Sequence, residues 1–258
     1  MDELRILNTV LTALLAMLGA SAGSFINVAA LRRSAGLSFI TGRSHCPSCR
    51  RTLSWFELIP VLSWFLLLGR CRKCKARISP RYMLVELMGA IAAGLCFVRY
   101  WLSWSMLLSF GVAVILLAIT MFDISTMEIP NGLIIALIPF AAAAFWVQPD
   151  VALLERGIGF ISVSVPMLIL ALLIDSAFGF GDVKLMAVCG FLLGWQNTVL
   201  AFFISVVTAG CLSIALILRG KAKKGAKIAF GPHLCLGVMA ALLYGKEIIS
   251  WYLSLFGF

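Results

Sequence analysis

Long apolar runs separated by short polar stretches dominate the chain. They lie near residues 6–31, 82–98, 102–122, 131–147, 157–175, 183–195, 198–218 and 232–256. The runs lack the strict alternation of barrel strands, and most approach the roughly 20 residues that a helix needs to cross a hydrocarbon core. Because the backbone finds no water in that core, we predict an all-α polytopic membrane protein with about eight transmembrane helices.

One long polar region, 32–81, separates the first two predicted helices. It divides the chain into a first transmembrane helix at 1–31, the polar region itself and a helical bundle at 82–258. Two interpretations of the polar region remain open, a small folded domain or a loop that rests on the membrane surface. The first apolar run is flanked by Asp2, Glu3 and Arg5, which favours a retained helix over a signal peptide with its basic leading segment.

Composition and charge place the chain in the membrane and orient it. With 62% apolar and 12% charged residues and a mean hydropathy of +1.05, an ordinary soluble domain is excluded. Region 32–81 holds eleven of the 21 basic residues and 219–227 holds five more, so both regions should face the cytoplasm. The number of predicted helices between the two regions also places them on the same side of the membrane. The net charge of +10 then reflects this sorting, and the expected neighbour is the anionic lipid bilayer and not nucleic acid.

Acidic residues near the cytoplasmic ends of the helices are the candidates for chemistry, because polar groups at membrane depth are costly. Asp123 closes the helix at 102–122, and Asp182 follows two glycines at the start of the helix at 183–195. A helix cap or a solvated interfacial aspartate is the structural alternative for each. The topology places five acids on or near this side: Glu86, Asp123, Glu128, Asp175 and Asp182.

The segments around the two aspartates resemble the motifs of the type IV prepilin peptidases. In that family one aspartate stands six residues before Ile-Pro, as Asp123 stands before Ile129-Pro130, and another stands in Gly-x-Gly-Asp-x-Lys, as at 179–184. Similar segments lie at 23–28 (Gly-Ser-Phe-Ile-Asn-Val), 43–49 (Arg-Ser-His-Cys-Pro-Ser-Cys), 78–86 and 230–232 (Phe-Gly-Pro). Ile26 replaces the usual Leu, and Arg-Arg-Ser at 32–34 replaces a frequent Arg-Leu-Pro; neither departure touches the aspartates.

The resemblance implies a membrane aspartyl endopeptidase with Asp123 and Asp182 as its catalytic residues. Such enzymes remove the basic leader, after a glycine, from type IV prepilins and type II secretion pseudopilins at the cytoplasmic face of the bacterial inner membrane. Two carboxyls sharing one proton can activate water and protonate the leaving amine. Only His45 and His233 offer imidazole bases, which disfavours a serine or cysteine protease.

The resemblance also implies a second activity, N-methylation of the new amino terminus with S-adenosylmethionine. Region 32–81 shows no strand followed by a glycine-rich turn, so this cofactor rests on resemblance alone and its binding residues stay unknown. Glu86 either contributes to methylation or pairs with an arginine.

The surroundings of the aspartates suggest finer roles, with alternatives. A helix N-terminus favours a carboxylate and a C-terminus disfavours it by roughly 0.3–1 kcal/mol, which predicts an ionised Asp182 and a protonated Asp123. Lys184 either supports the ionised Asp182 or anchors its helix. Gly179 and Gly181 form either a hinge or a tight turn. Glu128 and Asp175 are rival acids outside the motifs.

Four cysteines predict a structural zinc site in the region 32–81. Cys46-x2-Cys49 and Cys71-x2-Cys74 are separated by 21 residues, a spacing near the range of four-cysteine zinc sites. Four protein ligands leave no open position for catalysis, so the zinc-binding domain would be structural. Disulfides and free thiols remain alternatives, although a reducing cytoplasm favours zinc. The remaining cysteines, predicted to be small core residues, are Cys96, Cys189, Cys211 and Cys235.

Two other classes of function fit parts of the pattern. A transporter or channel also carries isolated acids at membrane depth. A zinc-bearing scaffold of a pilus or secretion machine would need the cysteines but not the aspartates. The sequence does not indicate an oligomeric state.

Overall fold

The computed structural model describes residues 2–34, 36, 44–174, 178–220 and 228–255. Within these ranges the chain forms helices and two isolated β-bridges, and no strand, which confirms the all-α prediction. Two compact units divide it, Met1–Met106 and Leu107–Phe258, and each is described by itself. The division at 31/32 and 81/82 stays a prediction. Arg43, Asp175 and the basic residues at 221–227 lie outside the described residues.

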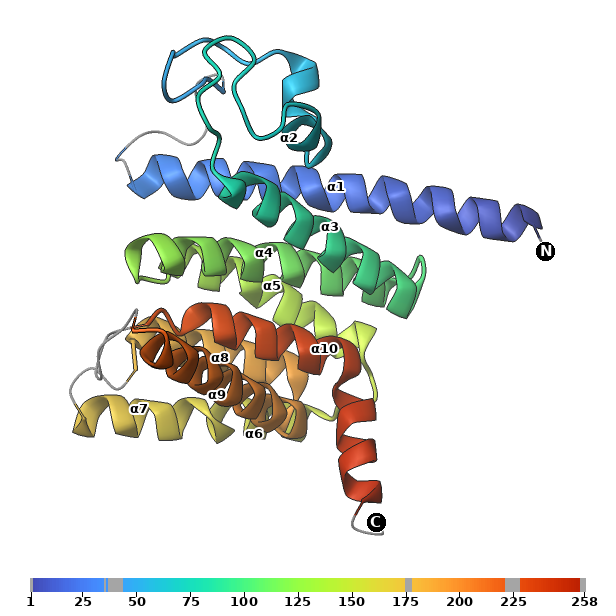
Figure 1. The fold of residues 1–258 in the computed structure, drawn as a ribbon. Coiled ribbons are helices and arrows are strands. Elements are labelled where there is room, and N and C mark those ends of the chain that lie inside the picture. Colours follow the sequence, from blue (N-terminus) through green and yellow to red (C-terminus); the bar gives the residue numbers. More distant parts are fainter. Residues whose placement is uncertain (1, 35, 37–43, 175–177, 221–227, 256–258) are drawn as a thin grey trace. The chain divides into compact units, whose positions relative to one another are not determined.

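The first unit is built on two long helices that pack along each other (Figure 1). These are α1 (Asp2–Ser34) and α3 (Pro80–Tyr100), with the short helices η1 (Trp55–Leu58) and α2 (Leu62–Leu66) between them in sequence. A side chain at Gly19 would meet the carbonyl of Gly89, and one at Gly89 would meet that of Gly19. Small residues of this kind let membrane helices approach closely.

The second unit is a helical bundle in which several helices meet around one core (Figure 1). The predicted helix at 157–175 is two helices that meet at Val163, and the last helix bends at Tyr244, where φ is −134° and ψ is 15°. The unit comprises α4 (Trp104–Thr126), α5 (Asn131–Val147), α6 (Leu153–Ser162), α7 (Ser164–Leu173), α8 (Phe180–Leu193), α9 (Trp195–Leu218) and α10 (Gly231–Ser254). The boundary between the units falls in the first turn of α4.

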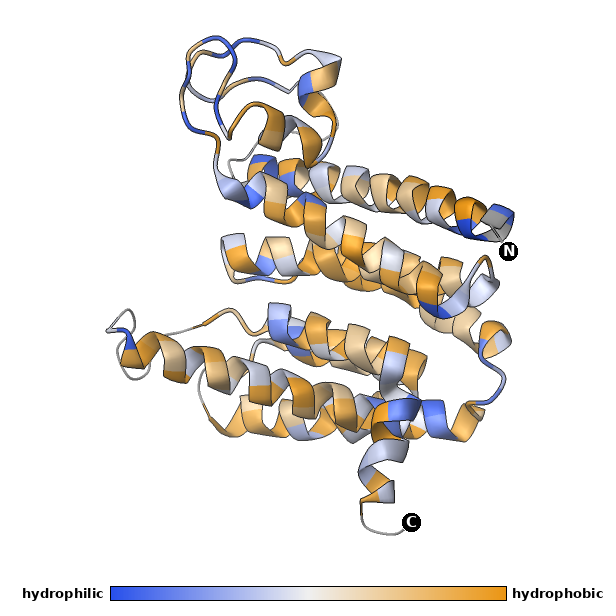
Figure 2. Cartoon of the chain, turned by 45° about the vertical axis from the view of Figure 1, so that its right-hand side comes forward, coloured by the Kyte–Doolittle hydropathy of each residue, from blue (hydrophilic) through white to orange (hydrophobic). Residues whose placement is uncertain are grey.

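Helix length and composition confirm a multi-pass membrane protein. Six described segments are long and apolar enough to cross a membrane: Arg5–Arg33, Pro80–Tyr100, Trp104–Thr126, Leu153–Leu173, Trp195–Leu218 and Gly231–Ser254. At 1.5 Å per residue, α5 and α8 reach only about 26 and 21 Å, short of the roughly 30 Å core. The number of about eight spans therefore stays a prediction. Figure 2 shows hydrophobic residues along the helices of both units.

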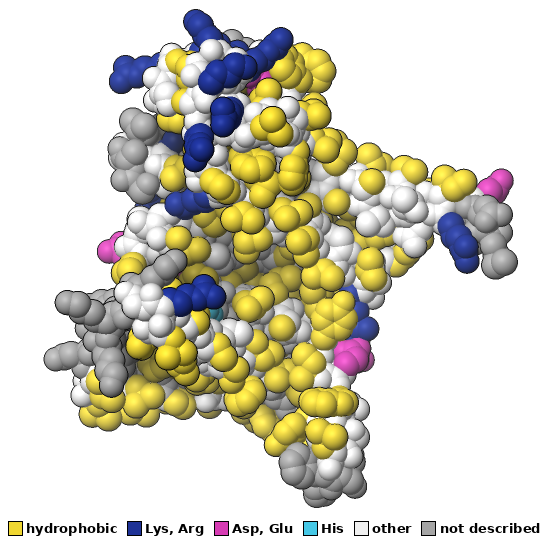
Figure 3. Space-filling view, viewed as in Figure 1, with side chains coloured by type: hydrophobic (Ala, Val, Ile, Leu, Met, Phe, Trp, Pro, Cys, Tyr) yellow, Lys and Arg dark blue, Asp and Glu magenta, His cyan; other side chains and the backbone are white. Residues whose placement is uncertain are grey.

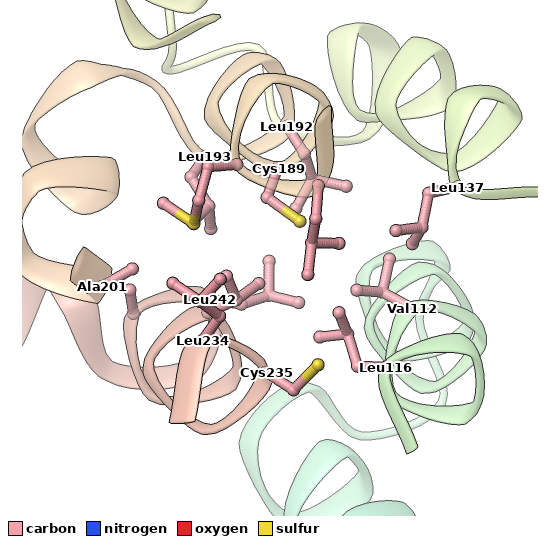
Figure 4. Packing of buried hydrophobic residues seen from close by; sticks show 14 of the residues in the cluster. Val112, Leu116, Leu137, Cys189, Leu192, Leu193, Ala201, Leu234, Cys235 and Leu242 are labelled. Atoms are coloured by element: carbon pink, nitrogen blue, oxygen red, sulfur yellow. The ribbon is translucent and has the colours of Figure 1, made fainter. Parts of the chain in front are cut away.

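The core of the second unit confirms two of the four cysteine predictions. Cys189 on α8 and Cys235 on α10 lie in the buried apolar cluster that includes Leu116 and Leu137 (Figure 4). Cys96, in the first unit, is also buried. The prediction for Cys211 is wrong: its side chain is exposed, because it lies on the face of α9 that points away from the bundle.

Arg156 on α6 is fully buried and holds the ends of two other helices. Its Nη2 donates to the carbonyls of Ala144 and Gln148 at the end of α5, both at 2.8 Å. Its Nη1 donates to the carbonyls of Phe191 and Leu192 at the end of α8, at 3.2 and 3.0 Å. The last carbonyls of a helix have no intrahelical partner, and their partial negative charge attracts a cation. Arg156 therefore fixes the ends of α5 and α8 opposite to those that carry Asn131 and Asp182.

Replacing Arg156 should destabilise the second unit. Arg156→Met keeps much of the apolar stem but removes the guanidinium donors from four carbonyls at the ends of α5 and α8. The free energy of unfolding in detergent should therefore fall by about 3 kcal/mol or more. Lys246→Met is the matched control, because Lys246 pairs with Asp150 at 2.8 Å while their side chains are 68% and 73% exposed. Exposed pairs contribute little, so this variant should unfold within about 0.5 kcal/mol of the wild type. Equal losses in the two variants would contradict the role given to Arg156.

Candidate active site and metal centre

Asp123 lies in the last turn of α4 and is 6% exposed. The Met127 N–H donates to the Asp123 carbonyl at 2.8 Å where the helix ends. The carboxylate oxygen Oδ2 accepts the backbone N–H of Gly231 at 2.9 Å. Gly231 is the first residue of α10, so the carboxylate of Asp123 lies at the N-terminus of a helix 108 residues further along the chain.

Asp182 lies in the first turn of α8 and is only partly buried. Its Oδ2 accepts the backbone N–H of Gly179 at 3.3 Å, as an acid in the first helical turn commonly does. The carboxyls of Asp182 and Asp123 are close enough for their charges to interact. The structure thus brings the two sequence-predicted aspartates together, one buried and one half-buried.

The segments that follow and precede the aspartates hold each other in place. A side chain at Gly181 would come within 2.9 Å of the Ile129 Cβ, so the two segments touch where glycine is required. The Lys184 Nζ donates to the Asn131 Oδ1 at 3.1 Å and joins the starts of α8 and α5. This contact favours the anchoring role of Lys184, and the close packing of Gly181 favours the tight turn.

A third segment, at the start of α10, connects both aspartates. The Phe230 ring packs on that of Phe178, with centroids 5.5 Å apart, and Phe178 precedes the Gly179 that binds Asp182. The next residue, Gly231, donates to Asp123. A Cβ on Gly231 would lie 2.7 Å from the Asp123 Oδ2, so this position leaves no room for a side chain.

Sequence reasoning did not identify this arrangement in full. The segment Phe-Gly-Pro at 230–232 resembles a segment of the family, but no role for it followed from the sequence. This resemblance was the only feature of the sequence that pointed to Gly231. Cys235, one turn further along α10, lies beside Thr120 of α4, a contact that no local pattern indicated. The Gly231 and Cys235 contacts, four residues apart, fix the register of α10 against α4.

The two carboxyls lie in similar electrostatic surroundings, contrary to the predicted difference in their protonation. Asp123 lies at the C-terminal end of α4, but its carboxylate accepts an N–H from the N-terminus of α10. Asp182 also sits at a helix N-terminus. Both carboxyls therefore face partial positive charge, and the ends of their own helices do not separate them.

The other candidate residues lie in separate surroundings. His233 Nδ1 lies 3.2 Å from the Thr208 Oγ1 and joins α10 to α9, and His45 is exposed in the first unit. Glu128 is exposed in the segment between α4 and α5. Glu86 accepts the Val61 N–H at 2.7 Å within the first unit.

The four cysteines of the first unit form one cluster. The Sγ atoms of Cys46, Cys49, Cys71 and Cys74 all lie within 4.8 Å of one another, and those of Cys46 and Cys74 are 3.8 Å apart. A tetrahedron with metal–sulfur bonds of about 2.3 Å has edges of about 3.8 Å. The thiols are free and form no disulfide, so the cluster fits a tetrahedral metal ion.

Two similar turns present these thiols. The Arg50 N–H donates to the Cys46 carbonyl at 2.9 Å, and the Lys75 N–H donates to the Cys71 carbonyl at 3.0 Å. Arg50 and Lys75 both have positive φ, 53° and 59°. Backbone N–H groups of Cys74 and Lys73 donate to the Cys71 sulfur and lower its pKa to about 6, toward the thiolate form that binds metals.

No site for S-adenosylmethionine emerges in the described part of the polar region. Residues 44–79 contain the isolated bridges His45–Thr52 and Arg70–Arg77 and no strand with a glycine-rich turn. The chain's residues for that cofactor stay unassigned.

Two family models match the chain. The bacterial Peptidase A24 N-terminal domain matches residues 17–100, and the type IV leader peptidase family matches residues 110–214. The first match contains the cysteine cluster and the second contains both aspartates. No solved structure matches the chain.

Curated relatives match over most of the chain. A prepilin leader peptidase/N-methyltransferase of Bacillus subtilis strain 168 is 36% identical over 247 residues, which cover 94% of this chain and 98% of the relative. Proteins of the same name from Aeromonas salmonicida and Pseudomonas aeruginosa are 34% and 30% identical, covering 82% and 94% of this chain and 75% and 93% of the relatives. The chain therefore belongs to the type IV leader peptidase family, as its two aspartate motifs implied.

Proposed function

We propose that this protein is a membrane-embedded aspartyl endopeptidase that removes the basic leader from type IV prepilins and type II secretion pseudopilins. The observation that carries the proposal is the meeting of the helix ends that hold the two aspartates. The Gly231 N–H donates to Asp123, and the neighbouring Phe230 packs on Phe178, beside the Gly179 that donates to Asp182. The family membership and the names of the relatives support the same activity. Asp123 and Asp182 are the proposed catalytic residues.

The chemistry needs only the two carboxyls and a water molecule. One carboxylate takes a proton from the water as its oxygen attacks the carbonyl carbon of the scissile peptide, and the other carboxyl protonates the carbonyl oxygen. The tetrahedral diol then breaks its C–N bond: the carboxyl that took the proton from water gives it to the leaving nitrogen, and the other carboxyl takes back a proton from a diol hydroxyl. Peptide and water thus give a free carboxyl group on the leader and a new amino terminus on the mature subunit.

The Gly231 N–H holds the buried Asp123 carboxylate in place for this step. Positioned hydrogen bonds in a site with little water act strongly on developing charge and need no reorganisation during the reaction. The Ile129–Gly181 contact and the Lys184–Asn131 hydrogen bond place Asp182 beside it. Gly231 is therefore a positioning residue in this proposal.

A second activity, N-methylation of the new amino terminus with S-adenosylmethionine, completes the proposed function. The names of the relatives support it. When bound, S-adenosylmethionine supplies the methyl group, and the chain's residues that hold it are not assigned.

The proposed location is the bacterial inner membrane, with the aspartates and the cysteine domain on the cytoplasmic side. The excess of Lys and Arg in 32–81 and 219–227 supports this orientation. A basic leader would remain on that side by the same rule. The proposed partners are therefore prepilin and pseudopilin precursors and the lipid bilayer.

We further propose that Cys46, Cys49, Cys71 and Cys74 bind one structural Zn²⁺. The thiol cluster has the size of a tetrahedral four-thiolate site, which would have no open position for a substrate. Zinc would stabilise the fold of the domain and take no part in hydrolysis.

Removing either catalytic carboxyl should abolish cleavage. Asp123→Asn and Asp182→Asn should each lower kcat for a prepilin precursor by at least about 1,000-fold, because neither amide can take or give the required proton. Because the residues act as a unit, the double variant should be no slower than the single ones. Leader release from purified protein in detergent, followed by mass spectrometry, measures the rates.

Glu128→Gln is the control for this experiment, because Glu128 is an exposed acid five residues after Asp123 and should leave cleavage unchanged. Near-normal cleavage by either aspartate variant would exclude the aspartyl mechanism. A wild type that does not cleave at all would favour a transporter or a scaffold.

Adding one methyl group at Gly231 should impair catalysis while sparing substrate binding. The Cβ of Gly231→Ala would displace the Asp123 carboxylate, and a misplacement of about 1 Å costs on the order of 100-fold in rate. We expect kcat to fall by about 10- to 100-fold with KM within about twofold, and the pH profile of kcat to change.

Gly132→Ala is the matched control, because a Cβ there meets no atom within 4 Å. This variant should keep the wild-type kcat and pH profile. Thermal unfolding of both variants checks the fold. An unchanged kcat in Gly231→Ala, or a loss of activity explained entirely by unfolding, would contradict the positioning role.

Metal analysis should find one zinc ion per chain in the purified protein. Cys46→Ser should lose the metal and make the segment 44–79 sensitive to limited proteolysis, because the thiolates no longer converge on an ion. Cys211→Ala should retain the zinc, since this exposed cysteine lies on α9 outside the cluster. Well under one zinc per wild-type chain would contradict the site.

A further inference from the structure

The short helices η1 and α2 expose large apolar side chains. Leu66 and Leu68 are 81% and 82% exposed, and Trp55 is 79% exposed. We call this set the apolar patch: Trp55, Leu58, Leu62, Phe65, Leu66 and Leu68. A cluster of exposed apolar side chains on a small domain marks an interaction site.

Contacts on the inner side of these helices show that the fold itself turns the patch outward. The Trp64 ring packs against Gly69, and its Nε1 donates to the Ile78 carbonyl at 3.4 Å. The Arg72 guanidinium lies 5.2 Å from the centre of the Phe56 ring. Trp64 and Phe56 thus contact the rest of the cysteine domain, whereas the side chains of the apolar patch stay exposed.

A hydrogen bond to α3 sets the depth of this segment relative to the membrane helix. The Val61 N–H, at the start of α2, donates to the Glu86 Oε2 at 2.7 Å. Glu86 follows Pro80, the first residue of α3, by six positions, or about 9 Å along the helix. Side chains of a helix lean toward its N-terminus, so the carboxylate lies nearer the Pro80 end. Val61 therefore lies at the level of the first turns of a membrane-spanning helix, where the hydrocarbon meets the headgroups.

The unusual backbone conformation of Val61 indicates that surrounding contacts hold this residue in place. Its φ is 63° and its ψ is −54°, a region that a β-branched residue avoids. Such conformations persist where surrounding contacts determine them. The bond to Glu86 is such a contact, and it directs the N–H of Val61 toward α3.

Charge indicates what covers the patch. The acid in the described segment 44–79 is Glu57, which is buried and paired with Arg51. Figure 3 shows Lys and Arg side chains close to hydrophobic ones on this domain. The exposed cations of the segment are Arg50, Arg70, Arg72, Lys73, Lys75 and Arg77. Such a surface repels a basic leader and attracts anionic headgroups, by about 1 kcal/mol for each cation near the membrane.

We propose that η1 and α2 lie in the interface of the leaflet at the Pro80 end of α3. The apolar patch would lie against the acyl chains, and the cations would lie further from the bilayer centre, among anionic headgroups. Interfacial helices bury their apolar face about 5–10 Å into this boundary, which matches the level of Val61. The Glu86 bond tethers the segment to α3. The proposal rests on the membrane insertion of α3 and is independent of the peptidase activity.

Depth-dependent quenching tests the proposal on the full chain. A fluorescent amino acid replaces Leu66 in one protein and the exposed Lys75 in a second, each in lipid discs of equal parts phosphatidylglycerol and phosphatidylethanolamine. Lipids with a nitroxide near the top of the acyl chain should quench the probe at 66 at least about threefold more strongly than the probe at 75. Limited proteolysis of the segment 44–79 checks that both proteins are folded.

A second variant tests the hydrogen bond between Val61 and Glu86. Glu86→Ala in the protein labelled at 66 should reduce quenching at least about twofold, whereas Glu128→Ala, in the other unit, should not change it. Equal quenching of the probes at 66 and 75 would overturn the proposal. So would equal quenching of the probe at 66 in the Glu86→Ala variant and in the protein that keeps Glu86. Protection of the probe at 66 only after a prepilin is added would overturn it in favour of a protein-binding surface. Because no substrate is needed, loss of cleavage and loss of quenching are separate results.

Discussion

The hydrogen bond from the Gly231 backbone to the Asp123 carboxylate joins two helices whose sequences are far apart. Asp123 is 6% exposed, and its carboxyl needs a hydrogen-bond donor, since a buried polar group without a partner is costly. The N-terminus of α10 supplies one and adds the favourable field of a helix end. The rest of the site follows from this bond, because the same segment also packs through Phe230 on Phe178, just before the start of the helix α8 that carries Asp182.

The residues around the aspartates form pairs of contacts that join the two segments. Ile129 meets Gly181, and Asn131 meets Lys184. Each pair links the segment after Asp123 with the segment around Asp182. Changing one member therefore affects the position of both carboxyls, although most of these residues carry no chemistry themselves. In a pair of coupled acids, position decides how a proton is shared.

The bilayer explains where polar contacts occur in this chain. Inside a helix the backbone satisfies itself, so the unpaired N–H and C=O groups lie at helix ends. Gly231 provides a donor at one such end, and Arg156 caps the last carbonyls of α5 and α8. The Val61–Glu86 bond serves the same purpose in the first unit, at the start of α2. Helix packing through small residues completes the arrangement.

Local patterns determined the class of the protein and the candidates for its chemistry. Apolar runs predicted the helices, with 131–147 matched at both ends, because membrane spans need unbroken hydrophobicity. Clustered thiols and the two aspartate motifs were readable because their spacing is short. The break at Val163 and the exposure of Cys211 could not be predicted from local patterns, since both depend on which face of a helix packs against its neighbours.

Only the tertiary structure decided how distant helix ends meet. Gly231 lies 108 residues from Asp123, and no periodicity connects the two. Arg156 counted in the sequence as one more basic residue, yet it binds carbonyls of two helices. The sequence determined which residues could be buried, charged or reactive, because those properties belong to single side chains and their near neighbours. Which carboxyl receives which N–H depends on helix packing, and packing is set by the whole fold.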